Sequence, residues 1–530
     1  MLPMNVTRGL NLLTILIVAS VVGSVAFAWP SSSSDLFRVY DLEFEGEFAS
    51  YHVEDLNNDG LKDLMLLLQL RENERIEERK LSIYLQDKEG FAEPPNQTFT
   101  LAEDIILFDI GDVAGDLKKE FVYFSREGIF HYTLSDTAFI LNAHKLFETE
   151  SLFMLSDRTS LVTWDFVADL NDDEVDEVFV PKITQCDIHF RNPKSNDWLI
   201  NEIPLRAEPN VRGFYDEDYS VGNRADALYS TPHLLTEDFN DDGKIDLMGV
   251  YEDSLVVFCQ DEEGFFSQRC HHSIELHFGK IWRGQKIQRT RWGDKSERFF
   301  LRRIGDLNDD GVVDALSVRI STRESVMNPK NELHLYLGKR DTTDSVEEMF
   351  FADQPDQIVK PGGTLLVLDI LDLNDDRKHD LVMPTVNVGL TNIIRMLLTK
   401  SVEIQAETYL MKEDRYPDEP DSKTKMVIKF SFRGGTTSPV YEIEDFNGDG
   451  YLDVLSSQEE KRLVLFWGKE DDLFESNVGS KFNILLPQNG ELVSAMNMNR
   501  DEKCDIVIVY DEDNPKYPKL QNKVRILLAN

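Results

Sequence analysis

Short apolar runs separated by polar turns extend along almost the whole chain. An apolar run such as residues 365–371 precedes an acidic loop, and a second one such as residues 64–68 follows the loop. A third run and a tight turn come next, as at residues 81–85 and 87–90, and the third run returns at residues 255–259. Runs of this length bounded by turn-forming residues are typical of β-strands. The pattern therefore predicts an all-β protein built from repeated four-stranded units.

The acidic loop between the first two runs has nine positions, and residues 445–453 are its clearest copy. They read Asp-Phe-Asn-Gly-Asp-Gly-Tyr-Leu-Asp, so oxygen-bearing side chains occupy positions 1, 3, 5 and 9 and glycine occupies position 6. Ca²⁺ takes several oxygen ligands in proteins, and a glycine allows the sharp turn that brings them together. The loop therefore predicts a Ca²⁺ site whose role is structural.

The copies of this loop differ in how complete they are. Four carry every oxygen ligand and the glycine, and we expect metal there: Asp55, Asn57, Asp59 and Asp63; Asp238, Asn240, Asp242 and Asp246; Asp306, Asn308, Asp310 and Asp314; Asp445, Asn447, Asp449 and Asp453. Two lack the glycine, and we expect weaker sites there: Asp169, Asn171, Asp173 and Glu177; Asp372, Asn374, Asp376 and Asp380. The loops at 112–120 and 497–505 depart further, with Ala114 at position 3 and Asn497 at position 1, so no metal is expected in them.

The loops recur at intervals of about 50 to 75 residues, and a regular period of this kind indicates a repeat architecture. Four-stranded units repeated around an axis form a β-propeller. Eight loops predict eight blades, with seven as the alternative if the degenerate loop at 112–120 does not mark a separate blade. The last unit stops at a third strand, residues 524–528, whereas residues 36–44 form a strand before the first unit. We therefore expect residues 36–44 to complete the last blade and close the ring, which removes two exposed strand edges.

These loops and their flanking strands resemble FG-GAP/VCBS repeats, the family that includes the propeller of integrin α chains. The resemblance covers nearly the whole of residues 36–530 and implies metal in the loop that joins the first two strands of a blade. An EF-hand also contains such a loop, but it needs an acidic residue at position 12. In the four complete loops that position holds Leu66, Gly249, Ser317 and Ser456. The flanking segments are also strand-like, which argues against an EF-hand.

The N-terminal segment indicates where the protein acts. Arg8, an apolar stretch and the sequence Ala26-Phe27-Ala28 predict a secretory signal peptide over residues 1–28. An uncleaved membrane anchor is the alternative, because the apolar stretch is long enough to span a bilayer. Residues 29–35 would form a short polar spacer before the propeller. Both interpretations place residues 36–530 outside the cytoplasm, secreted or in a periplasm, where Ca²⁺ is plentiful.

The composition of the chain argues against some classes of binding partner. The chain is 41% hydrophobic, enough for a sizeable core, and carries a formal net charge of −41. Such a surface argues against nucleic acid and against anionic membranes. The chain has four cysteines, and their spacing does not indicate a disulfide framework. Cys186 and Cys504 are expected to be buried thiols.

The chain contains none of the common catalytic motifs, so we expect it to bind rather than to catalyse. The long connections are expected on the face opposite the acidic loops, where a rigid scaffold commonly carries binding residues. They are residues 206–231, 280–298, 321–331, 411–440 and 510–522.

One of these connections combines tryptophans with basic residues in an otherwise acidic chain. The candidate ligand-binding residues are Trp282, Arg283, Arg289, Arg291 and Trp292. Arginines and aromatic rings suit an anionic sugar or an acidic protein surface. Alternatively, the basic residues neutralise neighbouring acidic blades and the tryptophans fill gaps between sheets. The sequence thus favours an extracellular binding or adhesion module for a protein or glycan. A lectin-like polysaccharide binder is the alternative, an enzyme acting on polysaccharides is less favoured, and the oligomeric state is left open.

Overall fold

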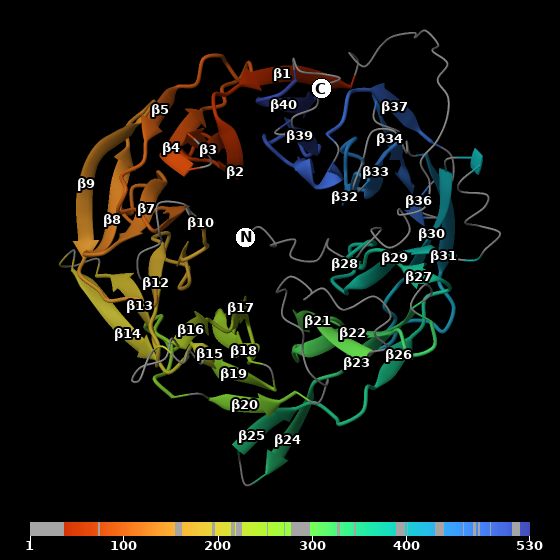
Figure 1. Ribbon diagram of the computed structural model, residues 1–530. Helices are drawn as coiled ribbons and strands as arrows, with labels where there is room; N and C mark the ends of the chain where they lie inside the picture. The colour runs from red at the N-terminus through yellow and green to blue at the C-terminus, as the bar shows by residue number, and fades with distance from the viewer. Residues whose placement is uncertain are drawn as a thin grey trace.

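The chain forms a ring of eight antiparallel sheets, an all-β propeller (Figure 1). The structure is a computed structural model. It describes residues 36–530 except 73–74, 154–161, 193–194, 196, 214–217, 219–224, 252, 270, 277–296, 326–328, 344–345, 388, 390–397, 400, 430–438, 459–460, 470–472, 475–477, 488 and 511–519. The predicted signal peptide, residues 1–28, and the spacer, residues 29–35, lie outside the described residues.

Blades are numbered in the order of their acidic loops, and their strands run from the centre of the ring outwards. Blade 1 consists of β2 (Glu47–Glu54), β3 (Asp63–Glu72), β4 (Arg75–Tyr84) and β5 (Gln97–Thr100). Blade 2 consists of β6 (Leu107–Gly111), β7 (Glu120–Ser125), β8 (Gly128–Leu134) and β9 (Phe139–Phe147). Blade 3 consists of β11 (Val167–Ala168), β12 (Glu177–Pro181), β13 (Cys186–Arg191) and β14 (Trp198–Ile203). Blade 4 consists of β17 (His233–Glu237), β18 (Asp246–Val250), β19 (Ser254–Phe258) and β20 (His272–Glu275).

The second half of the ring repeats this order. Blade 5 consists of β21 (Glu297–Gly305), β22 (Asp314–Ser321), β23 (Lys330–Tyr336) and β26 (Gln357–Val359). Blade 6 consists of β27 (Thr364–Leu365) with β28 (Asp369–Leu371), then β29 (Asp380–Val386), β30 (Ser401–Tyr409) and β31 (Ser422–Lys429). Blade 7 consists of β32 (Tyr441–Glu444), β33 (Asp453–Ser457), β34 (Arg462–Phe466) and β37 (Ser480–Asn483). Blade 8 consists of β38 (Val493–Met496), β39 (Asp505–Tyr510), β40 (Lys523–Ala529) and β1 (Phe37–Glu43).

Several smaller elements are added to this plan. A short strand, β10 (Val162–Thr163), pairs in parallel with β6 and makes blade 2 five-stranded. Three separate hairpins are formed by β15 (Glu208–Gly213) with β16 (Ala225–Ser230), β24 (Lys339–Thr343) with β25 (Val346–Phe350), and β35 (Gly468–Lys469) with β36 (Leu473–Phe474). A 3₁₀ turn covers Gly490–Leu492. Within the described residues, no helix is long and apolar enough to cross a membrane.

The ring closes in the way that the sequence predicts. β1 pairs antiparallel with β40 in an unbroken register from Phe37 opposite Ala529 to Glu43 opposite Lys523. Arg525 on β40 donates to Asp41 on β1 through two hydrogen bonds of 2.5 and 2.7 Å. Figure 1 shows β1 lying beside β40 at the closure. Eight blades are therefore confirmed, and the degenerate loop at 112–120 does belong to a blade of its own.

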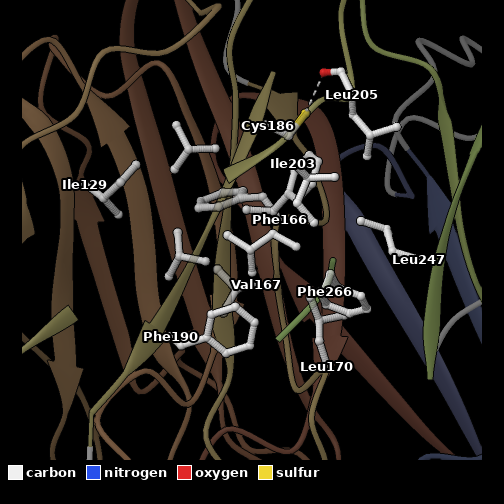
Figure 2. Close-up of a cluster of buried hydrophobic side chains, with 14 of the residues drawn as sticks. Ile129, Phe166, Val167, Leu170, Cys186, Phe190, Ile203, Leu205, Leu247 and Phe266 are labelled. Carbon is white, nitrogen blue, oxygen red and sulfur yellow. Dashed lines mark hydrogen bonds between the residues drawn. The ribbon is translucent and has the colours of Figure 1, made fainter. Parts of the chain in front are cut away.

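The hydrophobic core lies between neighbouring blades. One cluster joins Ile129 of blade 2, Phe190 and Ile203 of blade 3, and Leu247 of blade 4 (Figure 2). In the same cluster, the Cys186 thiol donates to the backbone carbonyl of Leu205 at 3.4 Å. Cys186 and Cys504 are free and buried, so the expected buried thiols at these positions are confirmed.

One predicted strand is interrupted. Residues 365–371 were expected to form a single strand, but pairing stops between β27 and β28. The partner strand β29 contains Pro384 at this point, and proline has no backbone N–H with which to continue the ladder. Residues 366–368 therefore bulge, while the N–H of Leu366 still donates to the carbonyl of Pro384 at 2.9 Å.

One expectation about the connections is also wrong. Residues 411–440 are not one long connection, because they contain the turn between β30 and β31, then β31 itself, and only then the connection to blade 7. Two small hairpins lie on the side of the ring that carries the acidic loops. The hairpins β24–β25 and β35–β36 are inserted there, between the third and fourth strands of blades 5 and 7.

Candidate metal sites in the acidic loops

Each acidic loop joins the first and second strands of its blade, and the loops share the backbone conformation of position 6. Position 6 has a positive φ in every loop, including those where the residue is not glycine. The values are 86° at Gly60, 70° at Leu117, 68° at Glu174, 82° at Gly243, 77° at Gly311, 64° at Arg377, 86° at Gly450 and 62° at Glu502. Absence of glycine at position 6 therefore does not change the backbone conformation at that position.

The position 1 aspartate organises the turn by accepting hydrogen bonds from the loop backbone. In blade 4, Asp238 accepts from the N–H of Asp242 at 3.1 Å and of Gly243 at 2.7 Å. Equivalent bonds reach positions 5 and 6 in the loops that begin at Asp55, Asp169, Asp306 and Asp372. These carboxylates therefore stabilise the turn through hydrogen bonds from amide groups of their own loop.

The position 9 carboxylate has a role that the sequence does not reveal. Asp314 is fully buried, and its two oxygens accept from the N–H of Leu307 at 3.2 Å and of Gly338 at 2.9 Å. Leu307 lies in the same loop, whereas Gly338 follows the third strand of the blade. Burial raises the pKa of Asp314 to about 7, well above the usual 3.8 of an aspartate. The side chain therefore ties the loop to the outer part of its blade.

The same double acceptance recurs around the ring. It is made by Asp63 with Leu56 and Gln86, Asp246 with Phe239 and Gln260, Asp380 with Leu373 and Met411, Asp453 with Phe446 and Gly468, and Asp505 with Met498 and Ala529. Position 9 thus has a hydrogen-bonding function even in the loop at 497–505, where no metal is expected.

In the degenerate loop of blade 2, a longer side chain at position 9 supports the turn from a different position. Ala114 stands where the other loops have asparagine, and the side chain of Glu120 accepts from the N–H of Ala114 at 3.0 Å. Burial, with Asp112 and Asp116 nearby, raises the pKa of Glu120 to about 8. Glu120 therefore supports the turn from position 9, where six of the other loops have the shorter aspartate and blade 3 also has a glutamate, Glu177.

Successive acidic loops contact one another from blade to blade around the ring. The position 8 N–H of one loop donates to the carbonyl at position 1 or 2 of the preceding loop, as from Lys119 to Leu56 at 2.9 Å and from Cys504 to Asp445 at 2.8 Å. The same bond links blades 2 and 3, blades 5 and 6, and blades 8 and 1. At the last junction the guanidinium of Arg500 covers Gly60, where an added Cβ would lie 1.9 Å from its central carbon. A side chain at position 60 would therefore displace the guanidinium of Arg500, and glycine adopts the positive φ without strain.

The loops supply the chemistry that a hard cation prefers. Every candidate ligand is a carboxylate or amide oxygen, which suits Ca²⁺. Within the described residues, no group of three or more His, Cys, Asp and Glu side chains is already gathered around one point that could hold a metal ion. Among the described residues of the acidic loops, however, one buried side-chain oxygen has no hydrogen-bond partner. It is Oδ1 of Asn308, at position 3 of the blade 5 loop, whose residue is 3% exposed. An unpaired buried carbonyl of this kind fits an oxygen ligand of a cation.

A charged cluster at the inner strands was not predicted. Arg303 on β21 lies 3.7 Å from Glu237 on β17 and 3.4 Å from Nε2 of His379, at position 8 of the blade 6 loop. It therefore connects three blades near the centre of the ring. Burial raises the pKa of the Glu237 carboxyl. The positive charge of Arg303 acts in the opposite direction and offsets part of this increase. The only signal in the sequence is that all three residues stand next to or within an acidic loop.

The candidate ligand-binding residues Trp282, Arg283, Arg289, Arg291 and Trp292 lie outside the described residues. They belong to the connection between β20 and β21, which joins blades 4 and 5.

Comparison with known proteins adds no family. No protein-family model matches the chain, and no curated protein sequence matches it.

Solved structures resemble it at low identity. The Dos1 propeller is 9% identical, with a TM-score of 0.39 over 93% of this chain and 95% of that one. An Agrocybe aegerita lectin specific for non-reducing terminal N-acetylglucosamine is 12% identical, with a TM-score of 0.36 over 91% and 99%. The Vibrio cholerae biofilm matrix protein Bap1 is 10% identical, with a TM-score of 0.29 over 94% and 91%. At these TM-scores the likenesses carry no argument about function. The class of protein, an eight-bladed β-propeller, rests on the strand pairing of the chain itself.

Proposed function

We propose that this chain is a secreted, Ca²⁺-stabilised β-propeller that acts as an extracellular binding or adhesion module and catalyses no reaction. Ca²⁺ binds in the acidic loops of the FG-GAP/VCBS type and stabilises the blades, while a protein or glycan partner binds the ring. The observation that carries this proposal is the recurrence of an oxygen-rich loop, with a positive φ at position 6, at the same place in every blade.

Electrostatics explain why a cation would stabilise such a ring. Several carboxylates in each loop lie close together, in a chain whose net charge is −41. Like charges held at short range destabilise the folded state unless they are protonated or neutralised. A cation that binds only the folded state stabilises it by about 2.7 kcal/mol when its concentration is a hundred times its Kd. Because several loops qualify, the effect on the whole ring would be larger than from one site.

The first test is thermal unfolding of the chelator-treated protein with increasing Ca²⁺. We expect a large increase in Tm with Ca²⁺ and a smaller one with Mg²⁺, since Mg²⁺ demands a tighter octahedral geometry and gives up its water reluctantly. A Tm that is the same in chelator and in millimolar Ca²⁺ would contradict the proposed role of Ca²⁺.

The second test addresses the partner. The protein is applied to an array of neutral and acidic glycans, with Ca²⁺ and with chelator, beside the double variant Arg289→Ala/Arg291→Ala. The matched control replaces two exposed arginines elsewhere, Arg212 and Arg269, by alanine. Binding to acidic glycans that only the first double variant loses would identify a lectin. Absence of binding by a folded, Ca²⁺-loaded protein would exclude the lectin alternative and leave a protein partner.

A further inference from the structure

The blade 5 loop differs from the others at its position 3 asparagine. In the loops of blades 1, 3, 4, 6, 7 and 8, Oδ1 of this asparagine accepts from the N–H at position 5, over 2.8 to 3.3 Å. In blade 5, the N–H of Asp310 bonds only to Asp306, and Oδ1 of Asn308 has no partner among the described residues. Asn308 is also 3% exposed, so its free oxygen is not satisfied at the surface.

The other end of the same amide lies between two carboxylates from different blades. Nδ2 of Asn308 donates to Oδ2 of Asp310 at 3.0 Å and to Oδ1 of Asp414 at 3.3 Å. Asp414 belongs to the turn between β30 and β31 of blade 6, where Lys412 pairs with Arg415. An amide NH₂ group carries only a partial positive charge, yet here it is the donor shared by two anionic groups.

Rotation of this amide would reverse the arrangement. Oδ1 of Asn308 would then face Asp310 and Asp414, and three oxygens from two blades would converge. Such convergence is repulsive without a cation and favourable with one, because a hard cation prefers oxygen ligands of this type. Asp306 and Asp314 of the same loop complete the oxygen-rich surroundings.

We propose that Asp414 supplies a ligand from blade 6 to the cation site of the blade 5 loop, residues 306–314, so that Ca²⁺ joins two blades at this point. This inference rests on the proposed role of Ca²⁺ and extends it, since the loop sites otherwise use residues of one blade. Affinity for Ca²⁺ rises with the number of charged ligands. The blade 5 site is therefore the tightest of the ring.

Hydrogen bonds between blades 5 and 6 already hold Asp414 next to the blade 5 loop. The N–H of His379 donates to the carbonyl of Leu307 at 2.9 Å, and the side chain of Gln357 exchanges two hydrogen bonds with the backbone of Tyr416, at 2.6 and 2.9 Å. These contacts fix the turn that carries Asp414 next to the loop. The cation therefore needs only a rotation of side chains, and no movement of the blades.

The test compares the full chain with two matched variants. Asp414→Asn removes the charge of the proposed ligand while keeping its size. Glu89→Gln removes a charge from the corresponding turn of blade 1, where Asp87 pairs with Gly90. Both residues are exposed, so both variants are expected to fold, which circular dichroism and gel filtration check. Calorimetric titration of the chelator-treated proteins with Ca²⁺ measures the affinities, and hydrogen exchange shows which segments Ca²⁺ protects.

We expect the wild type and Glu89→Gln to share one tightest Ca²⁺ site, and Asp414→Asn to bind Ca²⁺ at that site about tenfold more weakly. Ca²⁺ should slow hydrogen exchange in residues 306–314 and 410–421 together, and only Asp414→Asn should lose the protection of 410–421. Equal affinities in all three proteins, or protection of 306–314 alone, would overturn the inter-blade ligand while leaving the Ca²⁺-stabilised propeller intact. A wild type that binds no Ca²⁺ would overturn both.

Discussion

At the scale of single residues, the loop positions divide into those that the sequence explains and those that it does not. The sharp turn at position 6 is predicted correctly from the glycine there, because a positive φ is a requirement of that residue alone. The bonds of the position 9 carboxylate could not be predicted. One partner N–H lies beyond the third strand, and its distance along the chain varies from 14 residues for Gln260 to 31 for Met411. Because this separation is not constant, no sequence pattern predicts which N–H bonds to the position 9 carboxylate.

The position 9 carboxylate should therefore stabilise the protein even without metal. We expect Asp453→Ala to lower the free energy of unfolding by about 2–5 kcal/mol in chelator, because it leaves the buried N–H groups of Phe446 and Gly468 without an acceptor. The control Asp449→Ala removes an exposed carboxylate of the same loop and should cost about 1 kcal/mol or less. Denaturant unfolding measures both. Equal effects of the two variants in chelator would mean that position 9 acts only through a bound cation.

A second residue, Asp109 on β6, should make stability depend on pH. It is buried and accepts from the N–H of Phe166 at 2.7 Å and of Val167 at 2.8 Å. Burial raises its pKa from 3.8 to about 7, in spite of these bonds. A raised pKa means that the folded state holds the proton more tightly than the unfolded state. The resulting stability is present at low pH and is lost as the pH rises through about 7.

The comparison with Asp109→Asn isolates this contribution, since asparagine does not titrate. We expect the stability of the wild type, relative to the variant, to fall as the pH rises from 3.8 toward about 7. Tm measured at intervals across this range, in chelator, checks the sign. A difference that is constant with pH would show that Asp109 has an ordinary pKa in the folded protein.

At the scale of the element, strands and loops were predictable where the requirement is local. The position of each acidic loop and of most strands follows from apolar runs and turn residues. The interruption between β27 and β28 depends on Pro384 in a neighbouring strand, and the hairpins β24–β25 and β35–β36 replace turns that the sequence predicted to be short. These differences arise from pairing between segments, which a pattern along one segment does not contain.

The loop backbone yields a prediction for position 6. Glu174 has a φ of 68° there, which costs a residue with a side chain about 1 kcal/mol. We expect Glu174→Gly to raise the free energy of unfolding by up to about that amount, and Gly450→Ala to lower it by about 1 kcal/mol. An added Cβ at Gly450 meets no atom within 4 Å, so the backbone alone would be responsible. Denaturant unfolding of both variants checks the pair, and a stabilised Gly450→Ala would contradict the argument.

At the scale of the whole molecule, the number of blades and the closure were both predictable, because they follow from counting repeats and from a missing strand. The candidate metal sites were predicted as sets of residues. The contact of Asp414 with the blade 5 loop was not, since it depends on how one blade faces the next. The charged cluster around Arg303 escaped prediction for the same reason.

The closure should be essential for a monomeric fold. A chain that begins at residue 45 lacks β1, whose Phe37 and Leu42 are buried, and it leaves the edge of β40 unpaired. We expect it to aggregate or form larger species, since exposed strand edges pair with other chains. A chain that begins at residue 36 keeps β1 and serves as the control. Gel filtration with light scattering distinguishes the two, and a monodisperse, cooperatively unfolding chain from residue 45 would show that the closure is dispensable.

The same closure sets the order in which the protein can be completed during synthesis. Asp41 and Arg525, which join β1 to β40, are 484 residues apart. At typical rates of translation, about 5–20 residues per second, the ribosome needs roughly half a minute to a minute and a half to make the residues between them. Throughout that time the first strand of the ring has been made and its partner has not. Every prematurely terminated product that lacks β40 must then carry an unpaired β1, which gives cellular quality control one feature by which to recognise all of them.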